Sequence, residues 1–355
     1  MDKYKIDGHK LNYHLSRVTR WFNGETIYPI YMELSPSGMC NHRCTFCALD
    51  FMGYKKRFLD TDCMLERLIE MGKLGLKSVM FGGEGEPLLH RDIGLLTKTA
   101  KDSGIDTAFT TNGVFLDEEK SENILPYCEW IKVSINAGTA ANYAKIHRTK
   151  PTDFEKVIAN LRSAVKHRNS IKSSCVLGMQ ILLLPENRHE IKILAEIAAD
   201  IGMDYLIVKP FSQHPASKSS RYQDVRYDDA ETLCQELTAC NTGSFRVIVR
   251  TNTMARWNEK KHGYSRCRAL PFWSYIDSAG NVWGCSMYLN DDRFLYGNIN
   301  HNSFQKIWEG DKRRLSLDWL ERQFNANSCR INCRMDKINQ YLSDLKNPPR
   351  HINFI

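Results

Sequence analysis

Cys40-Asn41-His42-Arg43-Cys44-Thr45-Phe46-Cys47 is the stretch of this sequence that decides its fold and its chemistry. It comes shortly after Ile30-Tyr31-Met32-Glu33-Leu34, a run typical of a β-strand, and it spaces three cysteines as C-x3-C-x2-C. Thiolates this close together on one loop can bind one soft metal centre, and three ligands leave one iron of a 4Fe–4S cluster open. A zinc site is the alternative, but structural zinc takes four ligands and only His42 lies nearby as a fourth.

The composition is that of an ordinary globular protein with an unusual number of cysteines. A chain of 355 residues, 42% hydrophobic and 25% charged, can bury a core large enough for one big domain and a smaller one. No apolar segment follows Met1 and no run reaches the apolar length of a membrane span, so we expect a cytoplasmic protein. Without a signal peptide, twelve cysteines favour metal binding over disulfides. The net charge of +8 fits an anionic substrate or an acidic electron donor such as flavodoxin or ferredoxin, and equally a merely basic surface.

Short β-rich runs alternate with amphipathic helical stretches from residue 28 onward. The expected strands are 30–34, 78–81, 106–111, 130–135, 175–184 and 204–208, and the expected helices between them include 61–74, 93–103, 154–167 and 190–201. This alternation predicts an α/β fold, a partial (β/α)6 TIM-type barrel with its chemistry at the carboxyl ends of the strands.

A glycine-rich acidic turn, Phe81-Gly82-Gly83-Glu84-Gly85-Glu86-Pro87, follows the second expected strand. Taken with the cysteine triplet and the aromatic Phe46 before its last cysteine, the sequence resembles the radical S-adenosylmethionine (SAM) superfamily. The resemblance implies a SAM-binding 4Fe–4S cluster and reductive cleavage of SAM to a 5'-deoxyadenosyl radical. It also implies that Gly82, Gly83 and Glu84 bind the SAM amino group, and Phe46 is counted with the SAM-binding residues. A plain acidic loop is the alternative for the turn.

Further polar residues follow the later strands. Alternation puts Ser134 and Asn136 on one face, where the superfamily usually has Ser-x-Asp; Asn136 is therefore a candidate for the ribose of SAM that has lost the charge. Arg148 resembles the arginine that pairs with the SAM carboxylate, and an exposed surface arginine is the alternative. Gln180 lies within an apolar strand and either contacts the nucleoside or completes the core network.

A second group of cysteines, Cys267, Cys285, Cys329 and Cys333, follows near the C-terminus. With a hairpin around 278–281 between its first two members, it resembles the SPASM domain or its shortened Twitch form. Four cysteines suffice for one auxiliary 4Fe–4S cluster, so the Twitch form fits better. A zinc ribbon is the alternative, because four thiolates satisfy zinc equally well. The expected organisation is an N-terminal extension over 1–27, the barrel over 28–211, a lid loop and bridging region over 212–265, the cluster domain over 266–340 and a tail over 341–355.

The resemblance implies a radical SAM oxidoreductase or epimerase acting on a carbon-bound hydrogen. We expect a small, carbohydrate-like substrate (a sugar, amino sugar or nucleotide sugar), because 27 residues before the barrel are too few for a leader-peptide domain. Modification of a ribosomally made peptide by epimerisation or crosslinking is the first alternative, and a non-catalytic metal-binding scaffold is the second. Basic residues are scattered, so neither nucleic acid nor membrane is expected as a partner.

Overall fold

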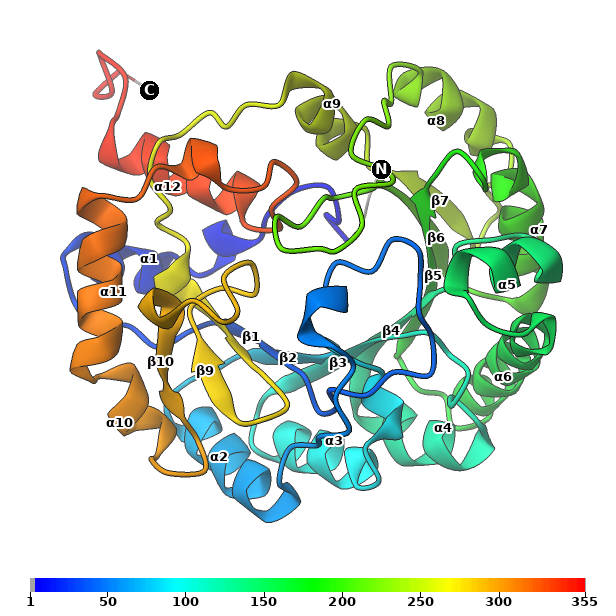
Figure 1. Cartoon of the computed structure of the whole chain (residues 1–355), viewed down its shortest axis with the longest axis horizontal. Helices are drawn as coiled ribbons and strands as arrows, with labels where there is room; N and C mark the ends of the chain where they lie inside the picture. The colour runs from blue at the N-terminus through cyan, green and yellow to red at the C-terminus, as the bar shows by residue number, and fades with distance from the viewer. Residues whose placement is uncertain (1–3, 355) are drawn as a thin grey trace.

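The computed structural model describes residues 4–354, which are built around one curved sheet (Figure 1). Its strands lie in the order β10-β9-β8-β1-β2-β3-β4-β5-β6-β7, parallel from β8 through β1 to β7 and antiparallel among β8, β9 and β10. The strands are β1 (Tyr31–Leu34), β2 (Ser78–Phe81), β3 (Asp106–Thr111), β4 (Cys128–Ser134), β5 (Val176–Leu183), β6 (Tyr205–Pro210), β7 (Arg246–Val249), β8 (Trp273–Ile276), β9 (Asn281–Trp283) and β10 (Leu295–Asn298).

Helices cover the outer face of this sheet (Figure 1). They are α1 (Leu15–Phe22), α2 (Thr61–Lys73), α3 (Ile93–Asp102), α4 (Glu118–Ile124), α5 (Ala140–His147), α6 (Pro151–Ser170), α7 (Ile191–Ile201), α8 (Ala230–Thr238), α9 (Thr251–Glu259), α10 (Phe304–Trp308), α11 (Asp311–Arg322) and α12 (Asp336–Lys346). Several begin where a side chain caps the first turn: Asp60 accepts from Cys63 N, Asp117 from Lys120 N and Thr139 from Asn142 N. None of the helices within 4–354 is both long and apolar enough to cross a bilayer.

Alternation along β4 separates a dry outer face from an inner face that lines a cavity. On β4, Ile131 and Val133 are buried in the main core with Leu34 and Phe81, whereas Trp130 and Lys132 line an interior cavity. The expected barrel is therefore present, with its apolar residues packed under the helices and its polar residues facing the lumen.

The sheet extends beyond the six expected strands on both sides. Within the expected bridging region over 212–265, β7 pairs with β6 as a seventh parallel strand. The C-terminal hairpin likewise joins the barrel, because β8 pairs with β1 from Tyr31↔Trp273 to Leu34↔Ile276. Local patterning predicts a strand but carries no information on its long-range partner, so these pairings were not visible in the sequence.

The first residues of the described chain lie across the opening between β7 and α12. Asp7 pairs with Arg250 and accepts hydrogen bonds from Thr253 Oγ1 and the Asn252 amide, while the ring of His9 lies 5.0 Å from that of Tyr341. These contacts close the side of the barrel that the sheet leaves open.

Candidate active site

The first cysteine loop leaves the end of β1 and is held against α5. The amide of Arg43 donates to His147 O (3.1 Å) and that of Thr45 to Ile146 O (2.9 Å). Burial, and the negative charges of neighbouring groups, raise the pKa of the Cys40 thiol to about 12 and that of Cys44 well above its usual range. Thiols this buried form thiolates only next to a compensating cation. Cys40, Cys44 and Cys47 lie close enough for their charges to act on one another. Three neighbouring thiolates are the donor set that an iron–sulfur cluster requires.

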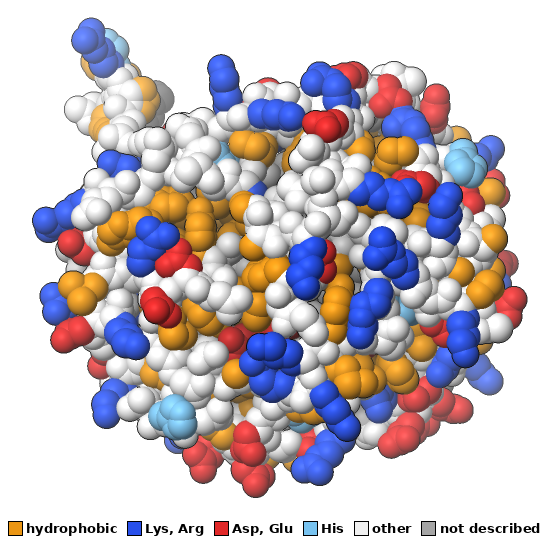
Figure 2. Space-filling model, in the orientation of Figure 1, with side chains coloured by type: hydrophobic (Ala, Val, Ile, Leu, Met, Phe, Trp, Pro, Cys, Tyr) orange, Lys and Arg blue, Asp and Glu red, His pale blue; other side chains and the backbone are white. Residues whose placement is uncertain are grey.

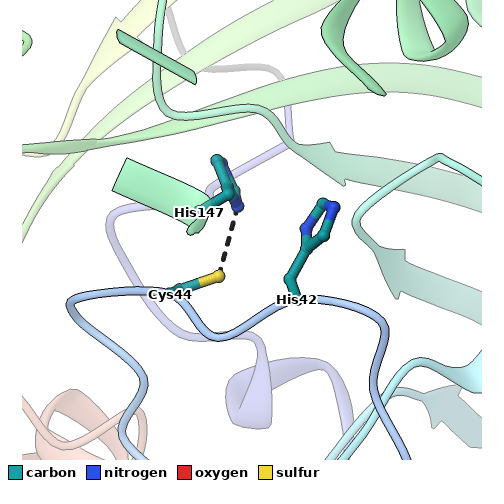
Figure 3. Close-up of side chains that lie close together, drawn as sticks. All are labelled: His42, Cys44 and His147. Atoms are coloured by element: carbon teal, nitrogen blue, oxygen red, sulfur yellow. Dashed lines mark hydrogen bonds between the residues drawn. The ribbon is translucent and has the colours of Figure 1, made fainter. Parts of the chain in front are cut away.

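His147 is a neighbour of this loop that sequence reasoning missed. Its Nδ1 lies 3.2 Å from Cys44 Sγ and its Nε2 lies 2.9 Å from Ile135 O (Figure 3). His42, Cys44 and His147 bring one ligand atom each within 4.8 Å of one another, but His42 Nε2 is engaged by Asp153 Oδ2 at 3.3 Å. Because Cys44 belongs to the cysteine triplet, we interpret His42 and His147 as neighbours of the cluster site and not as ligands of a separate metal centre.

Both carboxylate oxygens of Glu84 are engaged by protein groups. Its carboxylate is 4% exposed and accepts from Ser278 N (3.0 Å), Ser278 Oγ (3.3 Å) and Arg57 Nη2 (3.1 Å). Those partners hold it against the C-terminal hairpin, which favours a structural role for Glu84 over the expected contact with the SAM amine. Gly82 and Gly83 belong to the same turn, and Gly83, at φ 101°, packs against Ser35 and Tyr275.

Gly85 and Glu86 are the part of this turn that approaches the cysteine loop. A Cβ on Gly85 would lie 2.2 Å from Met39 O, and the Glu86 amide donates to the same oxygen at 2.9 Å, one residue before Cys40. Burial raises the pKa of Glu86 to about 7, although Asn112 N (2.8 Å) and Thr111 Oγ1 (2.5 Å) donate to its carboxylate. The sequence signal that could have distinguished Glu86 from Glu84 is the proline that follows it. Glu86-Pro87 places Glu86 at the N-cap of the short helix Pro87–Leu89.

Asn136 is part of the fold and not of an open site. It is fully buried at φ 54°, its Oδ1 accepts from Leu182 N (2.7 Å) and its carbonyl accepts from Asn187 Nδ2 (2.8 Å). These contacts favour a structural role for Asn136 over the expected contact with the ribose of SAM. Ser134 and Gln180 are adjacent across β4 and β5, with Gln180 Nε2 donating to Ser134 Oγ at 3.3 Å, and Gln180 lines the lumen.

Arg148 and Phe46 flank the cysteine loop. Arg148 is exposed at the C-terminal cap of α5, at φ 50°, and its charge acts on Cys44. The Phe46 ring meets that of His147 edge-on at 5.8 Å and lines the lumen. Both side chains remain available to a ligand bound over Cys44.

The second cysteine group surrounds a small apolar cavity of about 20 Å³, whose walls include Trp273, Phe294 and Phe324. All four cysteines line it: Cys267, Cys285, Cys329 and Cys333. Burial raises the pKa of Cys267 to about 12 and of Cys333 to about 11, with the neighbouring cysteines adding to the effect. Backbone amides already point at two sulfurs, from Met335 N to Cys333 Sγ (3.3 Å) and from Met287 N to Cys285 Sγ (3.5 Å). This set fits one fully ligated cluster.

One cavity of about 1090 Å³ fills the barrel between the two cysteine groups. Its lining includes Cys44 and Cys47 on one side and Cys333 on the other. The loop 212–227 lies over the cysteine loop, where Tyr222 OH is 2.8 Å from Thr45 Oγ1 and Ser217 Oγ donates to Cys47 O at 3.3 Å. A ligand in this cavity is therefore near both cysteine groups and shielded from water on that side.

Two sequence profiles match the chain in the regions that carry these sites. Residues 34–198 match the Radical SAM superfamily, and residues 267–334 match SPASM, an iron–sulfur cluster-binding domain. The protein belongs to the radical SAM superfamily. It is a radical SAM enzyme with a C-terminal SPASM domain, and its cofactors are SAM, the SAM-binding 4Fe–4S cluster and auxiliary iron–sulfur bound by the SPASM domain.

Similar proteins cover this radical SAM enzyme to different extents. A GTP 3',8-cyclase of Chlorobaculum tepidum is 26% identical over 54% of this chain and 57% of its own length. An S-adenosylmethionine-dependent nucleotide dehydratase of Lacinutrix mariniflava is 36% identical over 31% of this chain and 24% of its own length. The crystal structure of Streptococcus suis SuiB bound to precursor peptide SuiA has a TM-score of 0.66 and 18% identity over 88% of this chain and 71% of that chain. At that identity the similarity concerns the fold alone.

Proposed function

We propose that this radical SAM enzyme abstracts hydrogen from a carbon bearing oxygen or nitrogen in a small polar substrate, such as a sugar, amino sugar or nucleotide sugar. The result is dehydrogenation or epimerisation. The observation that carries the proposal is the cavity of about 1090 Å³ that touches Cys44 and Cys47 as well as Cys333. A substrate of this size class is enclosed between the two cluster sites, and ligand pockets typically range from about 300 to 1000 Å³.

Cys40, Cys44 and Cys47 would hold the 4Fe–4S cluster, which would supply the electron that cleaves SAM to a 5'-deoxyadenosyl radical. In our proposal Arg148 and Ser134 hold the SAM carboxylate and Gln180 contacts the nucleoside. Gly85 and Glu86 form the turn beside the SAM amine, because they approach Cys40 through Met39. The loop 212–227 excludes water from the reacting carbon, since Ser217 and Tyr222 bind directly to the cysteine loop.

Dehydrogenation is favoured over epimerisation. Loss of two hydrogens requires an acceptor for one further electron, and four cysteines around the second cavity leave no ligand position for substrate. An auxiliary cluster held this way is suited to electron relay. Epimerisation requires a hydrogen donor, usually a thiol, and every cysteine that lines the large cavity belongs to a cluster set.

The named activities of two relatives support a small substrate. A cyclase that acts on GTP and a nucleotide dehydratase both use nucleotides, although this chain matches only 57% and 24% of their lengths. An acidic electron donor such as flavodoxin or ferredoxin belongs to the proposal, in keeping with the net charge of +8.

The test uses anaerobically reconstituted enzyme with SAM, a reductant and separate panels of sugars, nucleotide sugars and peptides. The expected result is 5'-deoxyadenosine formed in step with a sugar product that has lost two hydrogens, detected by mass. A product of unchanged mass and inverted configuration would place the enzyme among the epimerases. Modification of a peptide with every sugar untouched would overturn the proposed substrate class.

A further inference from the structure

Two lysines project into the large cavity from neighbouring parts of the barrel. Lys132 lies on β4 between the outward-facing Ile131 and Val133, and its Nζ is 5.2 Å from the centre of the Trp130 ring. Lys209 lies near the end of β6, after the outward-facing Val208. Both lysines line the cavity, so their charges are directed at whatever the cavity holds.

Neither lysine has an acidic partner among residues 4–354. The carboxylates that line this cavity are paired with other cations: Glu33 Oε2 with Arg334 Nη1 at 2.5 Å, and Asp106 and Glu129 with Lys101 at 3.0 and 2.6 Å. Burial lowers the pKa of Lys132 to about 8, with Arg250 and Arg334 adding to the effect and Glu33 opposing it. Burial also lowers the pKa of Lys209 well below its usual range, reinforced by nearby cations that include Lys132.

Arg330 adds a third basic group to the same wall. It lines the cavity, its charge acts on Lys209, and its buried Nε has no hydrogen-bond partner. The three side chains are half-buried at the cavity wall, where their positive charges attract an anion, so three such groups around one cavity point to an anion of more than one negative charge. Basic side chains are also spread over the face shown in Figure 2, where acidic ones are more frequent toward the rim.

We propose that Lys132 and Lys209, with Arg330, form a subsite for a phosphate or diphosphate group of the substrate. The inference rests on the proposed function, because it narrows the small polar substrate to a phosphorylated or nucleotide-linked sugar. Such a group neutralises the unpaired cations and fixes the sugar in the space between Cys44 and Cys333.

Basic residues near the second cysteine group could instead balance the negative charge of the auxiliary cluster. The structure distinguishes the residues suited to that role from those suited to binding a substrate anion. The charge of Arg334 acts on Cys333 and Cys285, and that of Arg330 acts on Cys333. Arg250 and Arg334 act on both Lys132 and Lys209, and both lysines line the large cavity. The two lysines therefore face the substrate space, and Arg330 stands between that space and the cluster.

The experiment measures binding by calorimetry to the reconstituted holoenzyme saturated with SAM, with inorganic pyrophosphate, inorganic phosphate and malonate as probes. We expect pyrophosphate to bind most tightly, alongside SAM. Lys132→Met and Lys209→Met should each weaken it by about tenfold or more, as expected for a charge-assisted hydrogen bond. Lys166→Met is the matched control, because Lys166 is exposed on α6 and loses the same charge outside the cavity.

Each other outcome overturns the subsite. Equal binding by the parent and the Lys132→Met/Lys209→Met double variant places the anion elsewhere, and tighter malonate assigns the site to carboxylates. If SAM and pyrophosphate compete for binding, the two lysines belong to the SAM site. Loss of iron with unchanged pyrophosphate affinity makes them counter-charges of a cluster. Binding needs no turnover, so a failed subsite is distinguishable from a failed function, which is measured separately as 5'-deoxyadenosine and product.

Discussion

Replacement of Glu84 by alanine should loosen the C-terminal hairpin and leave SAM binding intact. The carboxylate joins the barrel to Ser278, between β8 and β9, through three contacts at 3.0, 3.3 and 3.1 Å. Hydrogen bonds to a charged group contribute about 1.5–3 kcal/mol each when buried. The Arg57 side chain is 30% exposed, so its ion pair adds only about 0–1 kcal/mol. The two Ser278 contacts share one residue and one of them is long at 3.3 Å, so their contributions are not additive and we expect a local loss of about 2–4 kcal/mol.

Hydrogen exchange followed by mass spectrometry measures this loss in the reconstituted protein. Amides of 273–283 should exchange roughly 30-fold to 1000-fold faster in Glu84→Ala, because about 1.4 kcal/mol corresponds to a factor of ten. Glu129→Ala is the control. Its carboxylate is paired with Lys101, but the two side chains are 48% and 36% exposed, so exchange should stay close to that of the parent.

The opposite pattern would refute the reasoning. If Glu84→Ala leaves exchange in 273–283 unchanged but weakens SAM binding in calorimetry, the carboxylate acts on the SAM amine, as the resemblance first implied. Glu84→Gln provides a second comparison, because it keeps the size of the side chain and removes only the charge.

Four further outcomes are expected. Alanine in place of all three cysteines of the first triplet should abolish 5'-deoxyadenosine formation, and cleavage that persists after reconstitution would contradict the cluster assignment. Arg148→Ala should weaken SAM binding by about 1.5–3 kcal/mol in calorimetry, the contribution of a charge-assisted hydrogen bond. The parent should contain about eight irons, four for each cluster. The Cys285→Ala variant should contain less iron and should still cleave SAM, but without coupling that cleavage to product. A parent with four irons and one zinc would make the second cysteine group a zinc site. Sulfate should bind more weakly as the pH rises through about 8, because burial lowers the pKa of Lys132 to about 8 and only the protonated lysine attracts the anion. The charge of sulfate itself does not change near this pH. An affinity independent of pH would exclude Lys132 from the anion site.

The local pattern of residues determined the elements and the cofactors of this protein. The spacing of Cys40, Cys44 and Cys47 and the alternation of strands and helices are short-range features, and short-range features set secondary structure and ligand type. The four later cysteines were assignable for the same reason. Expected strands such as 78–81 and 106–111 match β2 and β3 to the residue.

Only the tertiary structure decided which side chains meet. Glu84 and Glu86 stand two residues apart in the same acidic turn, yet one faces Ser278 and Arg57 and the other approaches the cysteine loop. Asn136 is a ribose candidate by sequence, and only the fold shows that its side-chain oxygen accepts a hydrogen bond from Leu182 N. The lysines of the cavity were not singled out as a pair, because 77 positions separate Lys132 from Lys209. Contacts between distant segments depend on strand pairing and packing across the whole barrel, and no local pattern encodes them.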